Sequence, residues 1–148
     1  MWILLDAGPL GLISNPSPKR AGRRAHDWAR ARIEAGDRLV VPEIADYELR
    51  RELLRAGKHK GIERLDVLIS AFGFRPVTTQ VLRDAAALWA DARNAGWSIA
   101  DPAALDGEVI LAAQARALAA EQDDDVVVAT TNTKHLKRFV DAKVWSAL

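Results

Sequence analysis

The chain has 148 residues, 49% of them hydrophobic, which is enough for one well-filled core and short for two. Its 21 basic and 20 acidic residues leave a formal net charge of +1, so any nucleic-acid binding must come from local clusters of charge. The absence of cysteine excludes disulfides, thiolate zinc sites and cysteine nucleophiles, and favours a reducing cytoplasm.

The start of the chain is apolar only for a few residues before Asp6. It has no basic region and no small-residue cleavage site, and no apolar run in the sequence approaches the roughly 20 residues of a membrane span. We therefore expect one cytoplasmic domain over residues 1–148, with no signal peptide and no membrane partner.

Short β-branched runs alternate with longer helical patterns, which predicts an α/β fold with a mostly parallel sheet of four or five strands flanked by helices. The expected strands are Trp2 to Leu5, Arg38 to Val41, a weaker Phe74 to Val77, Asp125 to Thr130 and a short Ala142 to Trp145. The expected helices are Arg20 to Ala35, Pro42 to Gly57, Lys60 to Ala71, Thr78 or Thr79 to Gly96, and the almost wholly apolar Leu105 to Ala120.

The stretch "WILLDAGPL" places an acid directly after the first strand. Ligands of open parallel sheets bind outside the carboxyl ends of the strands, so Asp6 is a candidate site residue. The alternative is that Asp6 only caps a turn, with "AGP" bending the chain.

Glu48 lies next to a clean apolar stripe in the helix that follows the second strand. The helix begins at the same edge of the sheet as Asp6, which favours a place for Glu48 at the border of the core. The alternative is an ordinary exposed glutamate.

Asp106 and Glu108 are two residues apart, which on a helix separates their side chains by about 200°. Glu108 stacks with Ala112 and Ala115 and is therefore expected to face the interior. Either acid could instead only favour the helix N-terminus through the macrodipole.

The segment "ATTNTKH" follows the most strongly β-forming run and supplies Thr130, Thr131 and Asn132 at a strand end. Hydroxyl and amide oxygens there suit a water, a metal or a phosphate. The same residues are also expected to cap the short helix that carries His135.

Together these segments resemble a PIN domain, in particular the VapC-type toxins of bacterial toxin-antitoxin pairs. The resemblance covers nearly the whole chain, through "LLDAGPL", "VPEIADYELRREL", "EVILAAQA" and "TTNTKHL" in this order. The family's usual third aspartate falls on Glu108, with Asp106 two residues earlier, and its fourth acidic position is the neutral Asn132. The choice between Glu108 and Asp106 stays open at this point.

The resemblance implies a PIN-like three-layer fold and a metal-dependent endoribonuclease. The implied metal ligands are Asp6, Glu48, Glu108 and, as an auxiliary, Asp106, while Asn132 and Thr130 or Thr131 would position the water or the scissile phosphate. Converging carboxylates repel one another without a cation, and Mg²⁺ or Mn²⁺ prefers oxygen ligands. The three histidines have no zinc-like spacing.

An RNA substrate needs positive charge near the acids, and basic clusters lie at residues 18–24, 50–60 and 134–138. The resemblance also implies a cognate antitoxin and a homodimer. Two alternatives are a catalytically weak or inactive RNA- or protein-binding module and a housekeeping RNA-processing nuclease. A phosphatase with Asp6 as nucleophile would need a second aspartate at residue 8, which is Gly8, and the early glycines match no phosphate-binding loop.

Overall fold

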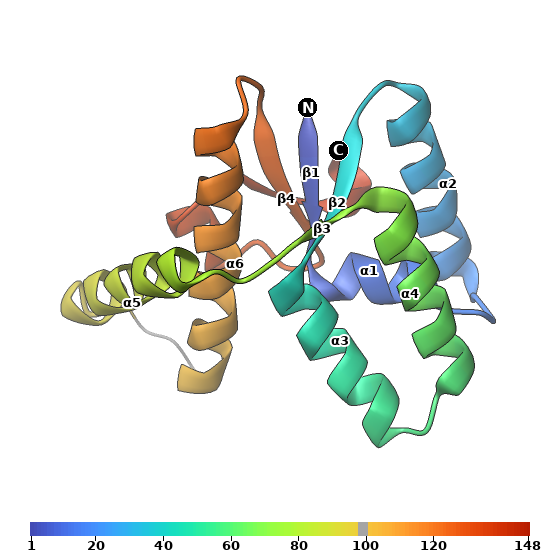
Figure 1. Cartoon of the computed structure of the whole chain (residues 1–148), viewed down its shortest axis with the longest axis horizontal. Coiled ribbons are helices and arrows are strands. Elements are labelled where there is room, and N and C mark those ends of the chain that lie inside the picture. The colour runs from blue at the N-terminus through green and yellow to red at the C-terminus, as the bar shows by residue number, and fades with distance from the viewer. Residues whose placement is uncertain (98–100) are drawn as a thin grey trace.

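Five short strands form one sheet in the order β3-β2-β1-β4-β5, and every neighbouring pair is parallel (Figure 1). The structure is a computed structural model that describes residues 1–97 and 101–148. The strands are β1 (Trp2–Leu5), β2 (Arg38–Pro42), β3 (Phe74–Arg75), β4 (Val126–Thr130) and β5 (Ala142–Val144). The chain builds outward from β1 to β3 and then returns to the other side of β1, so the strand order reverses between β1 and β4.

Helices cover both faces of the sheet. They are α1 (Ala7–Ser14), α2 (Arg20–Glu34), α3 (Glu43–Arg55), α4 (His59–Phe72), α5 (Thr79–Asn94) and α6 (Pro102–Glu121), with 3₁₀ turns at Leu136–Arg138 and Trp145–Ala147. Helices α1, α2 and α4 pack on one face, α6 packs on the other, and α5 packs against α6 (Figure 1). This is the PIN-like three-layer architecture expected from the sequence. No helix in the described ranges is long and apolar enough to cross a membrane.

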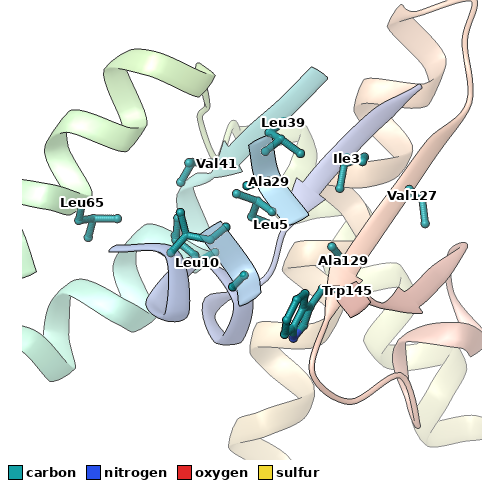
Figure 2. Close-up of a cluster of buried hydrophobic side chains, with 13 residues drawn as sticks. Ile3, Leu5, Leu10, Ala29, Leu39, Val41, Leu65, Val127, Ala129 and Trp145 are labelled. Atoms are coloured by element: carbon teal, nitrogen blue, oxygen red, sulfur yellow. The ribbon is translucent and has the colours of Figure 1, made fainter. Parts of the chain in front are cut away.

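Alternate strand residues fill the two halves of the core. Ile3 and Leu5 face α1 and α2, where they join a buried cluster that includes Leu10 and Trp145 (Figure 2). Leu4 faces α6 with its counterparts on β2 and β4. Both faces of β1, β2 and β4 are largely buried, which explains why these three strands read as continuous apolar runs.

Several boundaries differ from the sequence prediction. The "AGP" segment is not a bend: it begins α1, because Pro9 lies in the first helical turn, where its missing N–H is not needed. The third strand stops at Arg75, before Pro76, which cannot donate a ladder hydrogen bond. Pro42 ends β2 as the N-cap of α3 instead of opening the helix.

Two other ends also shift. The last strand stops at Val144, and Trp145 begins a 3₁₀ turn. Helix α6 starts three residues before Leu105, at Pro102, because Asp101 accepts a hydrogen bond from Ala103 N (2.9 Å) and caps it.

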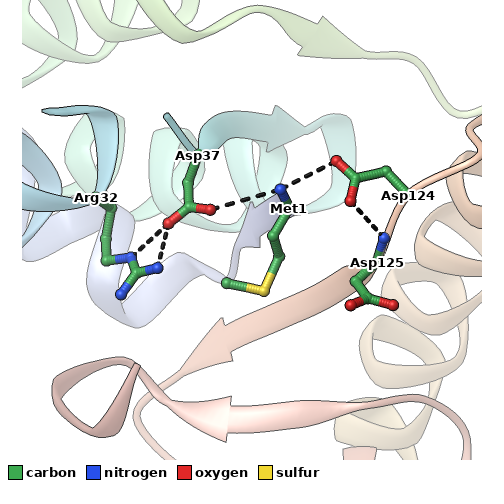
Figure 3. A network of polar contacts seen from close by, with 5 residues as sticks. All are labelled: Met1, Arg32, Asp37, Asp124 and Asp125. Carbon is green, nitrogen blue, oxygen red and sulfur yellow. Dashed lines mark hydrogen bonds and ion pairs between the residues drawn. The ribbon is translucent and has the colours of Figure 1, made fainter. Parts of the chain in front are cut away.

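A polar network holds the amino ends of the strands. The Met1 amine lies 3.0 Å from Asp124 and 3.5 Å from Asp37, and Arg32 donates to Asp37 (Figure 3). These contacts tie the start of β1 to the loops that precede β2 and β4. They lie at the amino ends of the strands, whereas Asp6 lies at the carboxyl ends.

Candidate active site

A pocket of about 400 Å³ opens at the carboxyl ends of β1 and β4, where α3 and α6 approach each other. Its lining includes Asp6, Glu48, Glu108, Thr130, Thr131 and Asn132. These residues come from four separate segments of the chain, and all were predicted site residues. The pocket lies where the strand order reverses, which is the usual ligand position in an open parallel sheet.

Asp6 is held by the register of two neighbouring strands. Leu5 of β1 pairs with Ala129 of β4, so Asp6 and Thr130 are the next residues along each strand. Thr130 is buried and donates its hydroxyl to Asp6 Oδ2 (2.7 Å), while Asp6 Oδ1 accepts from Ala7 N (2.7 Å). Both interpretations from the sequence therefore apply, because Asp6 caps α1 and also faces the pocket.

Glu48 extends from α3 toward α6 and is half-buried. Its pKa is raised above the ordinary value, first by burial and then by the charge of Asp6, with a smaller effect from Glu108; Arg51 works in the opposite direction. The three acids line the same pocket, which is why the charges of Asp6 and Glu108 act on Glu48.

Glu108 faces the pocket, and Asp106 does not. The exposed Asp106 lies on the other side of α6, beside Leu82 and Trp89 of α5, as the two-residue spacing requires. Burial raises the pKa of Glu108, opposed by His135. His135 Nδ1 lies 3.2 Å from Glu108 Oε1, whereas Glu108 Oε2 is buried and has no hydrogen-bond partner among the described residues.

The segment after β4 combines a structural role with a place in the pocket. Thr130 Oγ1 accepts from Asn132 N (3.2 Å), and Asn132 Oδ1 accepts from Lys134 N (3.0 Å). Asn132 is exposed and closes this turn, as the capping interpretation expected. Thr131 packs on α1 at Gly8, where a β-carbon would lie 2.7 Å from its methyl group.

Sequence reasoning missed three residues at or beside the pocket: Asp101, Gly107 and His135 in its contact with Glu108. Arg51 was predicted only as part of the basic cluster at residues 50–60 and not as a pocket residue. Arg51 follows Glu48 by three residues, so helical spacing could have placed it on the same side of α3. The Asp-Pro pair at residues 101 and 102 is a helix-start signal. No pattern in the neighbouring sequence predicts the place of Gly107 at the pocket or the contact of His135 with Glu108.

The donor set fits a hard divalent cation, because carboxylate, hydroxyl and amide oxygens surround the pocket and the buried Glu108 Oε2 lacks a partner. In the described part of the chain, however, no three acidic or histidine side chains are already arranged around one ion. Asp6 and Glu108 are each turned toward a hydrogen-bond partner. These hydrogen bonds fix the orientation of both carboxylates beside the pocket.

A scan against protein-family models and a search of curated proteins give no match. Among solved structures, a chain of VapBC2 from Rickettsia felis bound to a DNA fragment from their promoter is similar, with a TM-score of 0.69 and 16% identity over 97% of this chain and 98% of that one. A chain of FitAcB from Neisseria gonorrhoeae has a TM-score of 0.67 and 22% identity, and one of VapBC-1 from nontypeable Haemophilus influenzae has 0.66 and 17%, each over 99% of both chains. At these identities the likeness establishes the PIN-like fold.

Proposed function

We propose that the chain is a Mg²⁺- or Mn²⁺-dependent endoribonuclease, the toxin of a VapC-type toxin-antitoxin pair. One observation carries the proposal: Asp6, Glu48 and Glu108, which are far apart in the sequence, line one pocket at the strand-order reversal of a PIN-like fold. The end-to-end likeness to VapBC structures supports the toxin assignment.

In this proposal Asp6, Glu48 and Glu108 hold the ion. A bound divalent ion lowers the pKa of a coordinated water and stabilises the charge that develops on a phosphodiester during hydrolysis. The chain contributes orientation, because the Thr130 hydroxyl fixes one oxygen of Asp6 and His135 contacts one oxygen of Glu108. Thr131 and Asn132 are exposed at the pocket, which supports a contact with the substrate in this proposal.

Calorimetric titration with Mn²⁺ and a cleavage assay on labelled RNA test the proposal together. We expect Asp6→Asn to abolish specific Mn²⁺ uptake and cleavage while the thermal unfolding curve stays cooperative. The matched control is Asp106→Asn, which removes the same charge from an exposed position outside the pocket. We expect this control to behave as wild type.

Two results would contradict the proposal. If Asp6→Asn cleaved RNA at the rate of the wild type, Asp6 would not be part of a metal centre that cleavage needs. If instead Asp106→Asn lost Mn²⁺ binding and Glu108→Gln did not, the ligand assignment on α6 would be wrong.

The proposed partners are an RNA substrate, a cognate antitoxin and a second copy of the chain, in the cytoplasm. The toxin role is tested by expressing this chain together with the protein encoded by the adjacent reading frame. A toxin-antitoxin pair predicts that this short protein copurifies with the chain and suppresses its activity. An active chain without such a neighbour would point to a housekeeping RNA-processing nuclease. Light scattering of the isolated chain tests the dimer.

A second candidate is an inactive PIN-like module that binds RNA or protein. Two observations favour it: the fourth position is the neutral Asn132, and in the described part of the chain no three acidic or histidine side chains are already arranged around one point. The same titration discriminates, because an inactive module shows no specific uptake of Mn²⁺.

A further inference from the structure

Helix α3 carries three nearby arginines, and Arg51 differs from the other two. Arg50 forms ion pairs with Asp46 (2.9 Å) and Asp66 (2.6 Å), and Arg55 pairs with Glu52 (2.9 Å). Arg51 forms no ion pair with any described residue, although it is exposed and lines the acidic pocket. Its guanidinium is therefore available to an anion at the pocket.

Tyr47 lies one helical turn before Arg51, and the two side chains stack. The guanidinium carbon of Arg51 is 5.1 Å from the centroid of the Tyr47 ring. Tyr47 is 57% exposed, so its ring is accessible to a ligand in solution. The contact holds the two planar groups together beside the pocket.

The position of this pair relates it to the reaction centre. Glu48 lies between Tyr47 and Arg51 in the sequence, and the charge of Arg51 is close enough to lower the pKa of Glu48. A polyanion that approaches three carboxylates needs a cation at the entrance. An exposed aromatic ring beside that cation suits an unpaired base, which stacks on aromatic or guanidinium planes.

We propose that Tyr47 and Arg51 form a nucleotide subsite, in which the Tyr47 ring stacks on an unpaired base and Arg51 binds a backbone phosphate next to the scissile bond. This inference rests on the proposed nuclease function and assigns the contact with one unpaired nucleotide beside the scissile bond to two residues of α3. A base-paired nucleotide cannot present its face to Tyr47 in this way.

Fluorescence anisotropy with a labelled single-stranded RNA and a duplex of the same sequence, in EDTA to prevent hydrolysis, tests the subsite. We expect Tyr47→Ala to weaken single-strand binding by roughly tenfold, the usual effect of losing one base stack, and to leave duplex binding unchanged. Arg51→Gln should weaken both and reduce the salt dependence of binding. Tyr47→Trp, which keeps an aromatic ring, should restore single-strand affinity.

The matched controls come from another exposed arginine-aromatic pair, Trp89 and Arg93 on α5, which lies outside the pocket. Trp89→Ala and Arg93→Gln should bind RNA as wild type. The inference is overturned if Tyr47→Ala and Arg51→Gln bind single-stranded RNA as tightly as wild type, or if they change only the oligomeric state seen in gel filtration. Failure of the proposed nuclease function gives a different result from failure of this inference, because the wild-type chain itself would then neither bind Mn²⁺ nor cleave RNA.

Discussion

Gly107 of α6 leaves the space that the Glu48 carboxylate of α3 occupies. A β-carbon at residue 107 would overlap Glu48 Oε1, so no residue with a side chain fits there unless Glu48 moves. Glycine inside a helix costs about 1 kcal/mol relative to alanine. Helix α6 thus carries a destabilising residue at the point where it faces a predicted metal ligand.

We expect Gly107→Ala to stabilise the fold and impair the site. Because the overlapping atom is the end of a flexible side chain, Glu48 can rotate away while the helix gains about 1 kcal/mol, which corresponds to about 2–4 °C in Tm. The displaced carboxylate should lower Mn²⁺ affinity by roughly 10- to 100-fold, as losses of ligand orientation do. Calorimetry and thermal unfolding in EDTA measure the two effects.

Gly11 of α1 is the control for this substitution. It also lies inside a helix, but a β-carbon there would meet only Leu49 Cδ1, at an ordinary 3.4 Å. Gly11→Ala should raise Tm without changing Mn²⁺ affinity. Unchanged affinity in Gly107→Ala would show that Gly107 does not position Glu48. A fall in its Tm would show that Glu48 cannot turn away from the new β-carbon, against the predicted gain in stability.

Glu48→Gln should stabilise the metal-free protein at neutral pH. The pKa of Glu48 is raised by burial and by Asp6, so the ionised carboxylate weakens the fold above the ordinary value of 4.5. Removing this charge should raise Tm by about 2–4 °C, as relief of functional strain commonly does for a domain of this size. Mn²⁺ should raise the Tm of wild type more than that of the variant, because only wild type keeps all three carboxylates.

The pH dependence of this gain provides the check. Below the unfolded pKa both side chains are neutral and the gain should vanish; it should grow as pH rises toward the folded pKa and stay constant above it. Thermal unfolding in EDTA across this range measures it. A variant that is less stable than wild type at neutral pH would contradict the charge argument.

The features that the sequence predicts are those that follow from local pattern. The apolar runs around Ile3, Val40 and Val128 predict buried parallel strands, because both faces of each strand are covered. Asp6 follows such a strand and its partner Thr130 ends another, so both could be placed at strand ends from the sequence. The spacing of Asp106 and Glu108 also predicts that only one of them faces the pocket.

The remainder depends on contacts between distant segments. A glycine is needed at residue 107 only because Glu48, 59 positions earlier in the numbering, packs against it. The contact of His135 with Glu108 likewise depends on how α6 lies against the turn after β4. Helix α1 was missed for a different reason, because "AGP" favours a turn until the cap at Asp6 is seen.

His135→Ala should weaken the metal centre without unfolding the protein. His135 Nδ1 contacts Glu108 Oε1, and its loss frees a carboxylate that must point into the pocket. We expect Mn²⁺ affinity to fall roughly tenfold and His135→Asn, which keeps a donor near the position of Nδ1, to restore most of it. The control is His59→Ala, an exposed histidine at the start of α4. Equal affinity in His135→Ala and wild type would exclude this positioning role.

Gln114→Leu should destabilise the start of α3, which carries Glu48 into the site. The buried Gln114 amide joins three elements of the fold: its Oε1 accepts from Ile44 N (3.3 Å), and its Nε2 donates to Arg75 O (2.7 Å). Leucine is apolar and similar in size, so it leaves both backbone groups without these partners, at an expected cost of about 2–4 kcal/mol in the free energy of unfolding. Urea unfolding measures this loss, and Gln80→Leu on the exposed surface of α5 is the control, expected to lie within about 0.5 kcal/mol of wild type. If Gln114→Leu were as stable as Gln80→Leu, these two hydrogen bonds would not be what holds the start of α3 in place.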